Sequence, residues 1–99
     1  MTKAEAIRFV ESVLNQQREP SESGSLVVLD ELTRERPYGW VFFVNTERYA
    51  QTKDRRMSAI GNGPIIFQAA DSSMHRLPSG VNPDKAIADF ERRIPPDNR

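Results

Sequence analysis

The spacing of apolar residues at the start of the chain predicts an amphipathic helix over residues 2–17. Thr2 and Glu5 have the spacing of a capping box, in which each side chain bonds the other residue's backbone N–H and so starts a helix. We expect the helix to end near Gln17, because Glu19 precedes a proline and is disfavoured in helical conformation. The apolar residues that recur at helical spacing are Ala6, Phe9, Val10, Val13 and Leu14.

Residues 40–45 form the most apolar run of the chain and predict its clearest strand. Alternate side chains of an extended chain point to opposite faces of a sheet, so this run presents two faces. Both faces are apolar, and we therefore expect a central strand that is covered on both sides. The two sets of side chains are Trp40, Phe42 and Val44 on one face, and Val41 and Phe43 on the other.

Three further strands are predicted around this run. The first begins at residues 26–29, which are apolar and partly β-branched, and we expect it to continue through the polar residues 30–35 to a turn at Pro37. Residues 65–68 and 74–77 are the other two apolar runs, and a polar turn separates them. Together the four runs predict a small antiparallel sheet.

The end of the chain predicts a second helix over residues 83–94. Asn82 followed by Pro83 has the form of an N-cap with proline at the first helical position. The order α-β-β-β-β-α predicts an α+β fold, with about four antiparallel strands flanked by the two helices. We expect one domain over residues 1–94 and a frayed tail at 95–99. The expected core contains Ile7, Val10, Trp40, Phe42, Ile66 and Phe90.

Composition and charge exclude several classes of function. The 99 residues include 14 basic and 14 acidic side chains, so the net charge is zero and a nucleic-acid partner is not expected. The chain has no cysteine and one histidine, His75, which speaks against a metal site and against thiol or triad catalysis. It has no apolar run near the roughly 20 residues that span a membrane, and no signal-peptide core. We expect no cofactor, no small-molecule substrate and no membrane partner.

Candidate catalytic residues have more ordinary interpretations. Asp30, Glu31 and Glu35 are three carboxylates in a charged segment, where we expect a solvated or edge strand rather than a catalytic pair. The sequence has no Gly-x-Ser-x-Gly motif with a nucleophilic serine that His75 could activate. We therefore expect His75 on the surface of the sheet. The segment 61–64 has the composition of a phosphate-binding loop, but a strand follows it, which favours a turn with positive backbone angles. We therefore expect no catalytic residue.

The polar segment 46–62 is long for a connection between strands and is expected to contain a short helix at 47–51. Its basic side chains can bind phosphate or an acidic protein surface, or they can simply be solvated. Both interpretations stay open on the composition alone. The residues concerned are Arg48, Lys53, Arg55 and Arg56, with Tyr49 among them.

Two motifs in this order resemble a bacterial family, the immunity protein 35 group, also called the YrhB domain. The family has a Gly-Trp-x-Phe strand, a loop similar to Leu-Ala-Gly-Asn-Ala-Pro, and then a short turn, a strand and a final helix. The resemblance covers roughly residues 4–93. The residues that carry it are Gly39-Trp40-Val41-Phe42-Phe43, then Tyr49, then Ala59-Ile60-Gly61-Asn62-Gly63-Pro64-Ile65-Ile66.

The resemblance implies a small α+β protein of the cytoplasm that binds a polymorphic toxin and blocks its active site. It implies a toxin protein as partner, and we expect the protein itself to be a monomer or a weak homodimer. A chaperone-like or stress-linked accessory protein is the alternative, and it would bind many clients through exposed apolar surface. One tight partner distinguishes the first function from the second.

For a toxin partner, we expect the contacts to come from the polar segment 47–62 and from the turn before the strongest strand. Loops held by a rigid sheet commonly carry recognition. Arginine forms bidentate bonds to carboxylates, and tyrosine is a flat amphipathic anchor. The expected contact residues are Tyr38, Tyr49, Arg55, Arg56 and Asn62.

Overall fold

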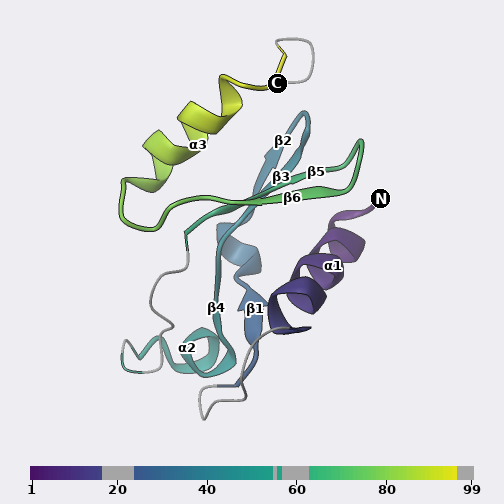
Figure 1. Ribbon diagram of the computed structural model, residues 1–99. Helices are drawn as coiled ribbons and strands as arrows, with labels where there is room; N and C mark the ends of the chain where they lie inside the picture. Colours follow the sequence, from purple (N-terminus) through teal and green to yellow (C-terminus); the bar gives the residue numbers. More distant parts are fainter. Residues whose placement is uncertain (17–23, 55, 57–62, 96–99) are drawn as a thin grey trace.

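Two helices lie on opposite faces of a four-stranded sheet in the computed structural model, which describes residues 1–16, 24–54, 56 and 63–95 (Figure 1). The sheet has the order β2-β3-β5-β6, and all neighbouring strands are antiparallel. Helix α1 covers one face and α3 the other. This arrangement confirms the predicted α+β class. The elements are α1 (Lys3–Gln16), β2 (Arg34–Arg36), β3 (Gly39–Phe42), β5 (Ile65–Gln68), β6 (Ser73–Arg76) and α3 (Pro83–Glu91).

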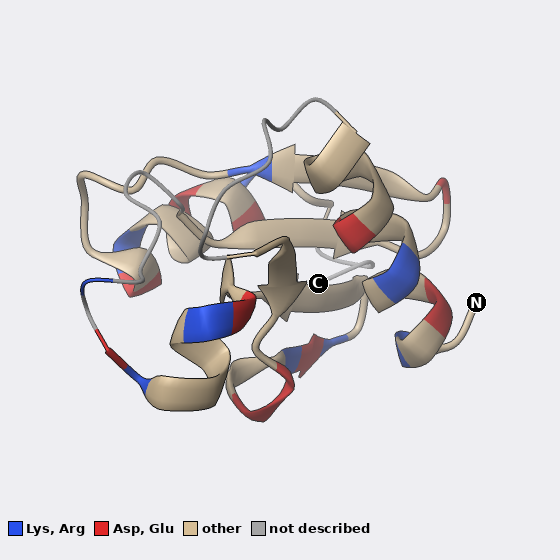
Figure 2. Cartoon of the chain, turned by 90° about the horizontal axis from the view of Figure 1, so that it is seen from below, with Lys and Arg blue, Asp and Glu red and all other residues tan. Residues whose placement is uncertain are grey.

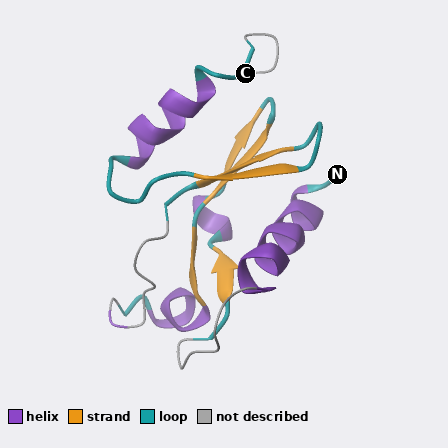
Figure 3. Ribbon diagram, in the orientation of Figure 1, coloured by secondary structure: helices purple, strands orange, loops and turns teal. Residues whose placement is uncertain are grey.

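A second, two-stranded sheet extends from one end of the first (Figure 3). It pairs β1 (Leu26–Val28) with β4 (Val44–Thr46) in antiparallel register. A short 3-10 helix (Asp30–Leu32) follows β1, and helix α2 (Glu47–Thr52) follows β4. The small sheet therefore links the large sheet to α2.

Two of the predicted strands are each divided in the structure, so the described residues form six strands in two sheets rather than about four in one. The strand expected over residues 26–35 breaks at the 3-10 helix, where Leu32 N–H donates to Leu29 O at 3.0 Å. The run expected as one strand over residues 40–45 divides at Phe43, whose carbonyl accepts from Leu29 N–H at 2.7 Å. Each half thus pairs with a different partner, which the continuous apolar run did not indicate.

The two terminal helices begin where the capping residues predict. Thr2 and Glu5 form both bonds of the capping box, at 3.0 and 3.2 Å, and α1 ends at Gln16. The side chain of Asn82 accepts from the first backbone N–H groups of α3. Helix α3 ends at Glu91, three residues earlier than predicted, and the chain then turns so that the last apolar residue of the expected stripe remains buried.

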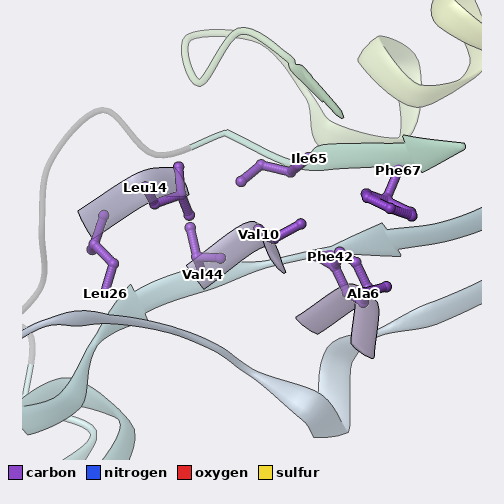
Figure 4. Packing of buried hydrophobic residues seen from close by; sticks show 8 residues of the cluster. All are labelled: Ala6, Val10, Leu14, Leu26, Phe42, Val44, Ile65 and Phe67. Carbon is purple, nitrogen blue, oxygen red and sulfur yellow. The ribbon is translucent and has the colours of Figure 1, made fainter. Parts of the chain in front are cut away.

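The core consists of two apolar clusters, one on each face of the large sheet. Figure 4 shows the α1 side, where three residues of the helix pack on residues of the strands. Of the expected core residues, Val10, Phe42 and Ile66 are buried, whereas Ile7, Trp40 and Phe90 are partly buried. The alternation predicted for residues 40–44 is confirmed. The α1 side has Ala6, Val10, Leu14, Leu26, Phe42, Val44, Ile65 and Phe67, and the α3 side has Tyr38, Val41, Ile66, Ile87 and Ile94.

Candidate partner-binding surface

Helix α2 is held firmly at its first turn. The hydroxyl of Thr46, a residue that is almost fully buried, accepts from Tyr49 N–H at 3.1 Å and so caps the helix. Glu47 N–H donates to Ser25 O at 2.9 Å, and Ser25 N–H donates to the Glu47 carboxylate at 2.8 Å. These bonds connect the start of α2 to the start of β1. The short helix predicted at residues 47–51 is thus confirmed and is one residue longer.

The last turn of α2 positions an aromatic ring and a cation together. Lys53 has a left-handed backbone (φ 58°), and its N–H donates to Tyr49 O at 2.7 Å. Its ammonium lies 5.7 Å from the centre of the Tyr49 ring and 3.0 Å from the carboxylate of Glu31. A backbone hydrogen bond and then the Lys53 ammonium lower the pKa of the Glu31 carboxyl. The Lys53 ammonium thus lies near both the half-buried Tyr49 ring and the Glu31 carboxylate.

Arg56 extends from the segment that follows α2. Its guanidinium bonds Asp54 through Nε and Nη2, the latter at 2.9 Å, and its backbone N–H bonds the same carboxylate at 3.0 Å. These bonds lower the pKa of the Asp54 carboxyl and raise that of Arg56. The Arg56 side chain is nevertheless 86 % exposed. In Figure 2, positive and negative side chains alternate along α2 and the described residues after it.

The structure separates the residues that were expected to form one contact surface. Tyr49 and Arg56 both belong to the segment around α2, whereas Tyr38 lies in the β2–β3 hairpin turn at the other end of the molecule (Figure 1). Tyr38 is only 6 % exposed, and its side chain packs in the cluster beneath α3. Arg55 and Asn62 lie outside the described residues.

Tyr38 connects the hairpin to the end of α3. Its hydroxyl donates to the Glu91 carboxylate at 2.9 Å, and Arg36 Nε lies 3.4 Å from the same carboxylate. Burial, and secondly the Glu91 carboxylate, raise the pKa of the Tyr38 hydroxyl well above its ordinary value, so the hydroxyl stays protonated and remains a donor. The side chain that was expected at an interface is thus a structural contact in this fold.

Replacing Tyr38 by phenylalanine is expected to lower the free energy of unfolding by about 1–2 kcal/mol, because a hydrogen bond to a carboxylate is lost in a partly buried place. Urea unfolding measures the change. The matched control is Tyr49→Phe, since the Tyr49 hydroxyl bonds no residue among those described; its effect is expected to stay within about 0.5 kcal/mol. Equal effects of the two substitutions would contradict this role of Tyr38.

The carboxylates considered for catalysis are exposed. Asp30 pairs with Lys3 at 3.0 Å, Glu31 pairs with Lys53, and Glu35 lies on an exposed edge strand. Within the described parts of the chain, no group of three or more His, Cys, Asp or Glu side chains is placed to hold a metal ion. These side chains are ordinary surface charges.

His75 occupies a structural position on β6, partly buried under α3. One ring nitrogen lies 3.1 Å from both Gln68 Oε1 and Ser73 Oγ, and the ring packs at 4.8 Å on Phe90. The amide oxygen of Gln68, the hydroxyl of Ser73 and the Phe90 ring thus hold the imidazole in place.

The turn expected before β5 differs at the one glycine that the structure describes. Gly63 does not have a positive φ. A Cβ built there would lie 2.2 Å from the carbonyl oxygen of Leu77, so the close approach of the chain after β6 requires a glycine. Gly61 and Asn62 lie outside the described residues.

Sequence reasoning missed a groove that the fold forms between β6 and α3. Arg76 at the end of β6 and Arg93 just after α3 both line a groove between these two elements. The only signal in the sequence was a cation at the end of a short strand, which is a common feature of surfaces. The groove itself arises from residues distant in the chain, and no local pattern describes it.

Comparison with known proteins gives one match. The family model described as immunity protein 35 matches residues 4–91. Searches of curated proteins and of solved structures find no match to the chain. Over the part of the chain that the structure describes, none of the helices has the length and apolar character needed to cross a membrane.

Proposed function

The chain belongs to the immunity protein 35 family, and we propose on this basis that it is an immunity protein that binds a cognate bacterial toxin in the cytoplasm and neutralises it. The match over residues 4–91 is the observation that carries the proposal. The partner is a polymorphic toxin, and the protein acts by binding rather than by catalysis. Such an activity needs a stable surface and no chemical group of its own.

The surface around α2 is the part of the protein that we propose to contact the toxin. Its first turn is capped and bonded to β1, so little conformational freedom is lost on binding. Tyr49 and Arg56 supply the two residue types that most often dominate binding energy. Arg56 is exposed, and a toxin carboxylate competes with Asp54 for its guanidinium. By sequence, Arg55 and Asn62 belong to the same segment.

The toxin candidate for the test is the product of the gene beside the one that encodes this protein. Its expression is expected to stop cell growth, and coexpression of the immunity protein is expected to restore growth. A single stoichiometric complex should purify from these cells. If the gene product is toxic but neither binds nor is neutralised, the proposed function is wrong, and capture of many weak clients would favour a chaperone-like role.

The double variant Tyr49→Ala with Arg56→Ala is expected to weaken the toxin complex about 30-fold, the equivalent of about 2 kcal/mol. Calorimetric titration measures this change, and a thermal melt checks that the variant is folded. Arg8→Ala is the matched control, because Arg8 is exposed on α1, away from α2. If the double variant binds as tightly as the control, α2 does not contribute to the interface.

A further inference from the structure

The edges of the sheets are protected in different ways in this protein. The outer edge of β1 is covered by side chains of α1: Asn15 bonds both the N–H and the carbonyl of Leu26, and Glu11 accepts from Val28 N–H at 2.8 Å. Strand β2, one edge of the large sheet, consists of three exposed charged residues, a composition that discourages pairing with another strand. These two edges are closed to further strands.

Strand β6 is the other edge of the large sheet and lacks both kinds of protection. Leu77 N–H donates to Pro64 O at 2.9 Å, which continues the β5–β6 register and shows which backbone groups face β5. Because bonding alternates along an antiparallel pair, the N–H and carbonyl groups of Met74 and Arg76 point away from the sheet. Among the described residues, no strand pairs with these groups and no backbone group bonds them.

The edge of β6 opens onto a groove of about 650 Å³ between this strand and α3. Its apolar lining includes Leu77, Phe90 and Val81, and Val81 is 48 % exposed. These apolar side chains lie beside the unpaired backbone groups of β6. Both features are typical of sites that accept an extended peptide as an added strand.

The charges that line the groove favour one kind of peptide. Arg76 and Arg93 form no ion pair with any described residue. The one acidic side chain of the lining, Asp89, pairs with Arg92 at 3.2 Å. Arg76 pairs in register with Ile65, so its side chain lies on the α1 face of this edge, whereas Arg93 lies on the α3 side. The edge therefore presents an unpaired guanidinium group on the face opposite the groove, and guanidinium groups bind carboxylates in a bidentate manner.

We propose that β6 and this groove accept an extended segment of the toxin in which acidic and apolar residues alternate. The segment adds to β6 as a fifth strand of the large sheet, bonding the backbones of Met74 and Arg76. Its carboxylates meet Arg76 on the α1 face of the edge, and its apolar side chains enter the groove on the other face, against Phe90. This inference rests on the proposed function for the source of the segment, but it concerns a surface distinct from α2.

The first test uses a synthetic peptide of alternating Glu and Val, which needs no toxin. In NMR hydrogen exchange, the peptide is expected to slow exchange of the Met74 and Arg76 amides at least tenfold. A Lys-Val peptide, with the opposite charge, and a Glu-Val peptide methylated at every backbone nitrogen, which cannot donate to β6 in either strand orientation, are expected not to do so. Protection by either control peptide, or none by the first, would overturn the proposal.

The second test reverses the charge at the proposed contact position of the protein. The variant Arg76→Glu is expected to bind the Glu-Val peptide at least tenfold more weakly than the matched control, Arg8→Glu. The control changes net charge equally at an exposed position that does not line the groove. Equal affinities of the two folded variants would show that Arg76 does not bind the peptide and would overturn the proposal.

The same exchange measurement on the toxin complex separates this inference from the proposed function. If the complex forms and the β6 amides stay unprotected, the added strand is wrong and the immunity function stands. If the Glu-Val peptide binds at β6 but the toxin does not, the bound segment does not come from the toxin, although β6 still accepts an acidic–apolar strand. Protection that rises with protein concentration without any peptide would assign the edge to a second copy of this chain and overturn the proposal.

Discussion

Replacing Phe42 by alanine is expected to lower the free energy of unfolding by about 3–5 kcal/mol. Phe42 is fully buried between α1 and the large sheet, with its ring centre 6.3 Å from that of Trp40 and 6.5 Å from that of Phe67. The substitution removes the apolar contacts of one ring and leaves a cavity that neither the helix nor the sheet can close completely. Small domains have only about 5–15 kcal/mol of stability in total, so urea unfolding at low temperature is the suitable measurement.

Phe9→Ala is the matched control for this substitution. Phe9 contacts the same cluster, with its ring centre 5.7 Å from that of Phe67 in an edge-to-face arrangement, but it is 39 % exposed on α1. The decrease in the free energy of unfolding is expected to be less than half of that for Phe42→Ala, because much of the Phe9 ring is already in water. A loss under about 1 kcal/mol at Phe42 would place β3 outside the core.

Replacing Gly39 by alanine is expected to lower the free energy of unfolding by on the order of 3 kcal/mol, because both the backbone conformation and the space around it exclude a side chain. Gly39 has a φ of +149°, which residues with a side chain rarely adopt. A Cβ there would lie 2.1 Å from the carbonyl oxygen of Phe67 on β5. Relief of this clash has to separate β3 from β5 at the start of their pairing.

Gly80→Ala is the control for Gly39→Ala, since a Cβ at Gly80 meets no atom within 4 Å. Its effect is expected to lie within about 0.5 kcal/mol of zero, as for an open surface position. Unfolding of the two variants in urea, side by side, separates the effect of the close approach from the general effect of replacing a glycine. Similar stabilities would show that β3 and β5 can move apart at little cost.

The local signals of the sequence were sufficient for the helices. A capping box at Thr2 and an N-cap with proline at Asn82 act within one helical turn, so these starts do not depend on the rest of the fold. The period of apolar residues then determined which side of each helix faces the core. The end of α3 was less well predicted, because the apolar stripe continues to Ile94 although the chain there is a turn.

The candidate binding surface was predicted in part. The cations and the tyrosine around α2 were recognised as a group, but their partners were not, since Lys53 bonds Glu31 from a distant segment. Tyr38 was expected at an interface because loops and turns on a rigid sheet commonly carry recognition. It is buried because α3 folds over the hairpin and Glu91 accepts its hydroxyl, which is a contact between residues far apart in the chain.

The sequence by itself determined the α+β class, the positions of the helices and the two apolar faces of residues 40–44, because these depend on spacing along a single segment. Only the tertiary structure decided that this segment divides at Phe43 between two sheets, since the choice of a pairing partner depends on distant strands. It also decided that Arg76 and Arg93 line one groove beside an open edge. Sheet pairing and helix packing bring such residues together, and neither leaves a periodic pattern in the chain.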